Sequence, residues 1–155
     1  MSDRKPPRFA ADERQTLLAL LSYQRDSLAR KVSGVADDRA TAMRVPSGTT
    51  LLWLANHMAD AEITWLIRRF AQSDDAAFAV HADALEHAVA RYRMVCDATN
   101  KVVAAAPSLD ALWPPFDDEP AVNLRWILLH LLEETARHAG HADILRETID
   151  GATGR

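Results

Sequence analysis

Apolar residues recur at helical spacing in four long segments of this chain, and no segment shows the alternation that is typical of a strand. The four expected helices span residues 13–32, 50–71, 83–106 and 124–149. Asp12 and Asn123 stand where N-caps belong, and Gly151 stands where the last helix should end. Pro114 and Pro115 exclude a continuous helix between the last two segments. The pattern predicts an all-α four-helix bundle with a longer loop before its last helix.

The length of 155 residues suits a single domain, with a core expected over residues 12–151 and a tail over residues 1–11. A formal net charge of -4 and the lack of a basic stripe argue against a nucleic-acid partner. No run of about 18 apolar residues occurs, so no membrane span is expected. Cys96 is the only cysteine, which excludes an intrachain disulfide and a multi-cysteine metal site. Since no signal-peptide pattern is visible, the expected location is the cytoplasm.

The last expected helix departs from the usual pattern of a core-facing stripe. Ile127 and Leu131 begin an apolar stripe, which Glu134, His138 and His141 then occupy. Glu134 and His138 lie one turn apart on one side of a helix, with a rise of about 6 Å between them. Because a buried carboxylate costs several kcal/mol unless it is paired or bound to a metal, Glu134 requires a partner.

A histidine on the second expected helix can supply that partner. His57 shares its stripe with the apolar residues Leu54 and Trp65. If both helices face the centre of the bundle, His57 meets Glu134 and His138. Two imidazoles and one carboxylate form a three-ligand set with open positions for water or a substrate. This ligand set suits zinc, and equally a ferrous ion.

Simpler roles for these residues remain open at this point. A lone core histidine is more often structural than a ligand, and Glu134 could pair with His138 alone or with Arg137 at the surface. His141 and His130 flank the proposed site and are candidates for contacts with a ligand or a substrate, although a hydrogen-bonded or solvated histidine is the alternative. Arg137 is a candidate for binding a substrate carboxylate. Trp113 and Phe116, on the loop before the last helix, are candidates for a pocket wall.

The segment Trp126–Asp143 resembles the last-helix motif of the DinB-like superfamily. In that motif a metal ligand is followed four residues later by a histidine, then by any residue, a glycine and usually a glutamine. Glu134, His138 and Gly140 match this pattern, and His141 takes the place of the glutamine.

The segment Leu54–Met58 resembles the other motif of the superfamily, which supplies the first metal histidine, here His57. The resemblance extends over about residues 13–151 and implies the four-helix fold. Most members carry histidine at the position of Glu134, whereas the branch that includes mycothiol-dependent maleylpyruvate isomerase carries glutamate. The resemblance therefore implies a metal site made of His57, Glu134 and His138, with mycothiol as the thiol.

The leading hypothesis for function is a metal- and thiol-dependent transferase or isomerase that acts on a small electrophile. The expected metal is zinc, with nickel or iron as alternatives, and metal-bound thiol or water replaces a side-chain nucleophile. The alternatives are a hydrolase that uses metal-bound water, a non-catalytic metal- or ligand-binding stress protein, and a ferrous oxygenase. The expected partners are a small-molecule substrate and a low-molecular-weight thiol, and a homodimer is left open.

Overall fold

The computed structural model describes residues 5–113 and 120–153, and within them the chain is helical, with one isolated bridge between Leu112 and Asn123 and no strand. The long elements are α1 (Glu13–Val32), α3 (Leu51–Glu62), which continues as the π-helix η1 (Ile63–Phe70), α4 (Leu85–Ala105) and α5 (Leu124–Asp150). A short helix α2 (Asp37–Ala40) and a 3-10 turn η2 (Ala76–Phe78) complete the set. The prediction of an all-α bundle is confirmed, while Pro114, Pro115 and Phe116 lie outside the described residues.

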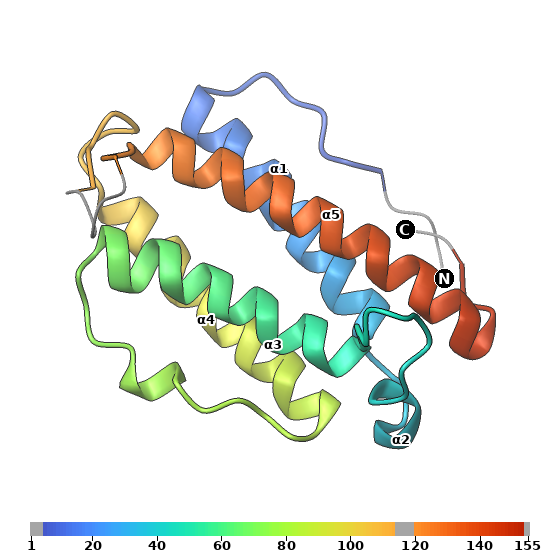
Figure 1. Ribbon diagram of the computed structural model, residues 1–155. Coiled ribbons are helices and arrows are strands. Elements are labelled where there is room, and N and C mark those ends of the chain that lie inside the picture. The colour runs from blue at the N-terminus through green and yellow to red at the C-terminus, as the bar shows by residue number, and fades with distance from the viewer. Residues whose placement is uncertain (1–4, 114–119, 154–155) are drawn as a thin grey trace.

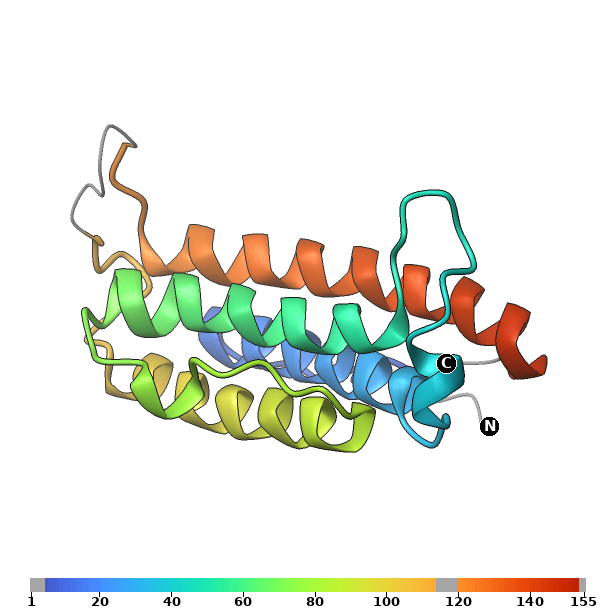
Figure 2. The ribbon, with the colours of Figure 1, turned by 60° about the horizontal axis from the view of Figure 1, so that its bottom comes forward.

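The four long helices form two adjoining pairs. α1 packs most extensively against α5, and α3 packs most extensively against α4. Figure 1 shows that α1 and α5 run in one direction and that α3 and α4 run in the other. The segment between η1 and α4 therefore crosses the length of the bundle. Figure 2 shows α5 and α3 side by side along one face, so residues on facing sides of these two helices can meet.

The helix ends follow the capping signals of the sequence. The Asp12 carboxylate accepts a hydrogen bond from the Gln15 backbone N–H at 2.8 Å, and the Asn123 side chain accepts one from the Trp126 N–H at 2.9 Å. Gly151 ends α5 in the left-handed conformation, with φ of 74°. These contacts satisfy backbone groups that a helix end would leave unpaired, and they place the start of α1 and both ends of α5 within one residue of the prediction.

The second helix of the bundle changes its winding halfway along. An uninterrupted helix was expected over residues 50–71, but from Ile63 onward the backbone forms a π-helix. The Ala71 N–H donates to the Leu66 carbonyl at 3.0 Å, which is the five-residue spacing of that conformation. The spacing of apolar residues in the sequence did not predict this change of winding.

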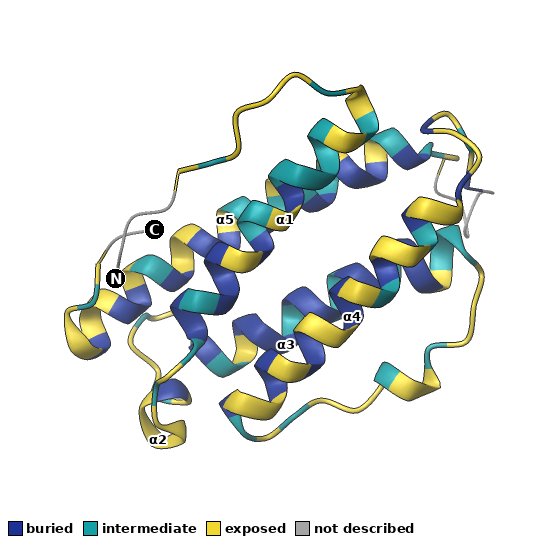
Figure 3. Cartoon of the chain, turned by 180° about the vertical axis from the view of Figure 1, so that it is seen from behind, coloured by how far each residue is buried: buried dark blue, intermediate teal, exposed yellow. Residues whose placement is uncertain are grey.

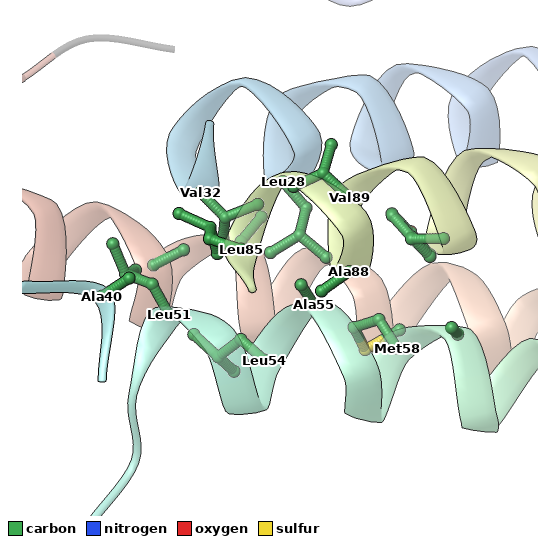
Figure 4. Close-up of a cluster of buried hydrophobic side chains, with 14 of the residues drawn as sticks. Leu28, Val32, Ala40, Leu51, Leu54, Ala55, Met58, Leu85, Ala88 and Val89 are labelled. Carbon is green, nitrogen blue, oxygen red and sulfur yellow. The ribbon is translucent and has the colours of Figure 1, made fainter. Parts of the chain in front are cut away.

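The hydrophobic core consists of two clusters along the bundle axis. The larger cluster includes Leu28 of α1, Leu54 and Met58 of α3 and Val89 of α4, which are labelled in Figure 4. The smaller cluster lies toward the end of the bundle that contains Trp113. Figure 3 shows the buried residues of the long helices on their inner faces, with exposed residues outside. No helix of the described residues is long and apolar enough to cross a membrane.

A buried ion pair lies where the two clusters adjoin. Arg25 of α1 donates two hydrogen bonds to the carboxylate of Glu62, both at 2.6 Å. Thr99 of α4 donates to the same carboxylate at 3.0 Å. Glu62 is 0% exposed and Arg25 is 5% exposed, so each charge depends on the other for compensation. Arg25 is thus held inside the fold by this pair.

Candidate metal centre

The structure brings together the three side chains that the sequence singled out as metal ligands. His57 comes from α3, and Glu134 and His138 come from α5. Each offers one ligand atom, and the three atoms lie within 4.8 Å of one another. Glu134 Oε1 is 3.4 Å from His57 Nε2 and 3.0 Å from His138 Nε2. Of the groups of three or more potential ligands among the described residues, this is the one close enough to hold an ion.

The donor set fits a divalent cation. Zinc binds imidazole nitrogen and carboxylate oxygen at about 2.0–2.2 Å, so tetrahedral ligands lie roughly 3.4 Å from each other. The separations of 3.4 and 3.0 Å from Glu134 Oε1 are close to that value. The two histidine nitrogens lie within 4.8 Å of each other, so side-chain movement that brings them closer would place a cation among the three atoms, with at least one coordination position free for another molecule.

The protonation of the centre also suits a cation. Burial lowers the pKa of His138 below its ordinary value of 6.5, even though the hydrogen bond with Glu134 opposes this change. Burial raises the pKa of Glu134, but the hydrogen bonds with His138 and His57 and the charge of Arg137 outweigh it and hold that pKa below 4.5. His138 is thus neutral and Glu134 ionised near neutral pH, which are the forms that bind metals.

Two neighbours fix the orientation of the histidine rings. The Trp53 indole stacks on His57, with ring centroids 4.4 Å apart and planes 9° from parallel. The Nδ1 atom of His141 lies 3.3 Å from Nδ1 of His138, on the opposite side of that ring from Glu134. Ligand histidines usually hydrogen-bond through their second nitrogen, which sets their tautomer and orientation. His141 occupies that position here.

The centre is partly open to solvent. The side chains of His57 and Glu134 are 33% and 20% exposed, whereas that of His138 is 10% exposed. A pocket of about 310 Å³ lies on the His57 side, and its lining includes Trp53, Asn56, Asp60 and His81. A small molecule can therefore reach the centre without a rearrangement of the bundle.

The structure distinguishes pairing of Glu134 with the histidines from pairing with Arg137 at the surface. Arg137 lies 3.9 Å from the distal oxygen Oε2, while it lies 3.2 Å from Glu133 Oε1. The two histidines share the other oxygen, Oε1, at shorter distances. The principal contacts of Glu134 are therefore with His57 and His138, and the exposed Arg137 pairs with Glu133.

The remaining candidates lie in an aromatic cluster toward the end of the bundle. His130 stacks on Trp126 with centroids 5.0 Å apart, and its ring meets Trp65 edge-on at 4.8 Å. Trp113 is 2% exposed and packs against Trp65, and Arg69 lies over both indoles. The structure does not bring His130 or Trp113 against the three proposed ligands. His130 packs against Trp65 and Trp126 instead.

Sequence reasoning did not single out Trp53, which lies against the proposed ligand His57. Trp53 is 47% exposed, and its contact with His57 reflects a spacing of four residues on one helix. That spacing was the available signal. His141, by contrast, was already a candidate for contact with a ligand, and the structure places it against His138.

Comparison with known proteins supplies both a family and a fold. A family model described as mycothiol-S-transferase matches residues 16–151. A solved structure of a conserved protein from Enterococcus faecalis has a TM-score of 0.68 and 15% identity, over 92% of this chain and 100% of that chain. A DinB-like protein from Bacillus cereus has a TM-score of 0.67 and 16% identity, over 89% of this chain and 96% of that chain. No curated protein matches the chain significantly.

The two kinds of comparison support different conclusions. At such low identity the two structures show the fold alone, which agrees with the expected DinB-like bundle. The family model extends over all four long helices, apart from the first turn of α1, and includes His57, Glu134 and His138. The chain therefore belongs to the mycothiol-S-transferase family.

Proposed function

We propose that this protein is a metal-dependent transferase that joins mycothiol, through its sulfur, to a small electrophilic molecule. The observation that carries the proposal is the convergence of His57, Glu134 and His138 within 4.8 Å in a partly exposed site. The family match supports mycothiol as the thiol at the level of the family.

In this proposal the three side chains hold a divalent cation, for which zinc is the first expectation and nickel or iron are alternatives. A cation held there supplies positive charge that makes a thiol more acidic at neutral pH. His141 holds the ring of His138 in place, and Trp53 covers one face of His57. These contacts keep the donor atoms directed at one point before any substrate arrives.

The chain offers no nucleophile of its own in the described part of the site. Cys96, its only cysteine, lies on α4 among core residues. Burial and the charge of Glu62 raise the pKa of the Cys96 thiol to about 12, so the thiolate is scarcely populated at neutral pH. The attacking sulfur must therefore come from a separate molecule.

The proposed reaction is a substitution whose atoms balance without any further reagent. The mycothiol sulfur forms a bond to the electrophilic carbon, and the leaving group departs with the electrons of the broken bond. The thiol proton passes to solvent. A cytoplasmic location is part of the proposal, because low-molecular-weight thiols are kept reduced there.

The test combines metal content with consumption of mycothiol in the presence of 2-chloroacetamide. Metal-loaded wild-type protein is expected to release chloride and form the thioether. His57→Ala and His138→Ala are expected to lose both stoichiometric metal and turnover while remaining helical by circular dichroism. His87→Ala, an exposed histidine of α4, serves as the matched control and should retain both.

The outcomes separate the proposal from its alternatives. Full metal content in either ligand variant would refute the ligand assignment. Product formed with metal but without thiol would identify a hydrolase, and an altered substrate with regenerated mycothiol would identify an isomerase. Absence of turnover across electrophiles, with tight metal binding, would favour a non-catalytic binding protein.

A further inference from the structure

A small pocket lies next to the candidate centre, beside His141 and toward the C-terminal end of α5. It lies between the segment 41–50 and the second half of α5, where Figure 2 shows the segment rising beside the helix. Its volume is about 190 Å³. The lining residues are Val45, Ser47, Thr49, His141, Ile144 and Leu145.

The lining of this pocket suits an apolar group. It contains no aspartate, glutamate, lysine or arginine, and Val45, Ile144 and Leu145 supply aliphatic surface. The hydroxyl groups of Ser47 and Thr49 lie 2.9 Å apart and hydrogen-bond to each other. Ile144 is 60% exposed, so its side chain has apolar area that a ligand can still remove from water.

One histidine, His141, lies between the pocket and the proposed ligand His138. Glu134, His138, His141 and Leu145 follow one another along one face of α5 at helical spacing. His141 lines the pocket, and its Nδ1 lies 3.3 Å from His138 Nδ1. The pocket thus begins one imidazole ring beyond a proposed ligand.

We propose that this pocket binds the apolar group of the electrophile, for example a phenyl ring or a short alkyl chain. The assignment rests on the proposed function. A cavity of about 150 Å³ lined by apolar residues holds benzene, so a volume of about 190 Å³ is sufficient for a phenyl ring. The pocket beside Trp53 and His57 has a more polar lining and is left for the thiol.

The test uses two electrophiles that share one reacting group and differ in their apolar body. N-benzyl-2-chloroacetamide is expected to exceed 2-chloroacetamide in kcat/KM by about tenfold, after correction for the uncatalysed reaction and mainly through KM, because the ring leaves water. Ile144→Ser is expected to remove most of this preference by lowering kcat/KM for N-benzyl-2-chloroacetamide. Ile144→Leu should preserve the preference.

A matched control and a binding measurement complete the design. Leu129→Ser changes another half-exposed aliphatic residue of α5 that does not line the pocket, and it should keep the preference. Binding of N-benzylacetamide, which has no leaving group, is measured by calorimetry. Its affinity for the wild type should be at least several times that for Ile144→Ser.

Failure of the subsite and failure of the proposed function give different results. Turnover of both electrophiles with equal kcat/KM, together with unchanged binding in Ile144→Ser, would overturn the subsite and leave the transferase intact. Absence of turnover combined with N-benzylacetamide binding that depends on Ile144 would support the pocket and refute the transferase. Loss of the preference in Leu129→Ser as well would also overturn the assignment to this pocket.

Discussion

The Nδ1 atoms of His138 and His141 lie 3.3 Å apart, so one of these nitrogens carries the hydrogen and the other accepts it. The second nitrogen of His138, Nε2, faces Glu134 at 3.0 Å. If His138 is the donor, its Nε2 keeps a free lone pair, which is the form that a metal requires. The contact between these two residues thus connects a residue outside the ligand set with the chemistry of the centre.

Replacing His141 with alanine removes the partner of His138 Nδ1. We expect metal affinity to fall by about 10- to 100-fold, which is typical when the hydrogen-bond partner of a ligand histidine is lost. His141→Gln should retain most of the affinity, because the amide oxygen can accept the same hydrogen and glutamine is the residue usual in the DinB-like motif. Competition titration with a chromophoric chelator measures both. Equal affinities in wild type and His141→Ala would contradict this role.

Two substitutions of Glu134 distinguish ligation from simple ion pairing. Glu134→His should retain stoichiometric metal, because imidazole replaces carboxylate as the third donor. Glu134→Ala should weaken binding strongly, since two ligands hold a cation poorly. Metal content after dialysis provides the measurement, and Arg137→Ala is the control because Arg137 pairs mainly with Glu133. Similar metal content in all three variants would show that Glu134 is not a ligand.

The pH dependence of metal binding follows from the directions of two pKa shifts. The pKa of His138 is lowered from 6.5 and that of Glu134 is lowered from 4.5, so both are deprotonated at pH 7. Protons therefore begin to compete with the metal only as the pH falls below about 6.5, and histidine takes up the first of them. Affinity should be nearly constant from about pH 8 to 7 and should decline toward pH 5. An affinity that stays flat over the whole range would argue against histidine ligands.

The helices of this fold could be predicted because their signals are local. Asp12, Asn123 and Gly151 cap or end helices through contacts within a few residues, and the sequence contains those residues in order. The short helix α2 is not predictable in this way, since its N-cap, Ala36, makes no side-chain hydrogen bond. It is held in part because Asp37 accepts a hydrogen bond from the distant N–H of Leu85.

The candidate site could be predicted where polar residues interrupt an apolar stripe of a helix. Glu134, His138 and His57 stood out because each occupied a position where a core residue was expected. The contact between Arg25 and Glu62 gave no such signal, because it joins two helices across 37 positions of the sequence and depends on their relative rotation. His130 was misleading in part for the same reason, since Trp65 reaches it from η1, whereas Trp126 lies one turn before it on α5.

Among substitutions of buried polar residues, those that break the pair of Arg25 and Glu62 should lower the free energy of unfolding most. Glu62→Gln leaves the Arg25 charge without its compensating carboxylate, and the expected loss is about 3–5 kcal/mol of the free energy of unfolding. Urea denaturation followed by circular dichroism measures this change. Glu13→Ala, which breaks a surface pair with Arg125, is the control and should change stability little. A loss from Glu62→Gln no larger than that of the control would contradict a structural role for the pair.

The most direct test of the central claim, a metal centre that receives a thiol, is the melting temperature of four samples. Metal-loaded and metal-free protein are each heated with and without mycothiol. A ligand that binds only the folded state adds roughly 2.7 kcal/mol at about a hundred times its dissociation constant, which corresponds to an increase of roughly 5–10 °C in Tm for a chain of this size. We expect that increase in the metal-loaded protein and little change in the metal-free protein. Equal stabilisation of both forms, or of neither, would contradict a thiol site at the metal.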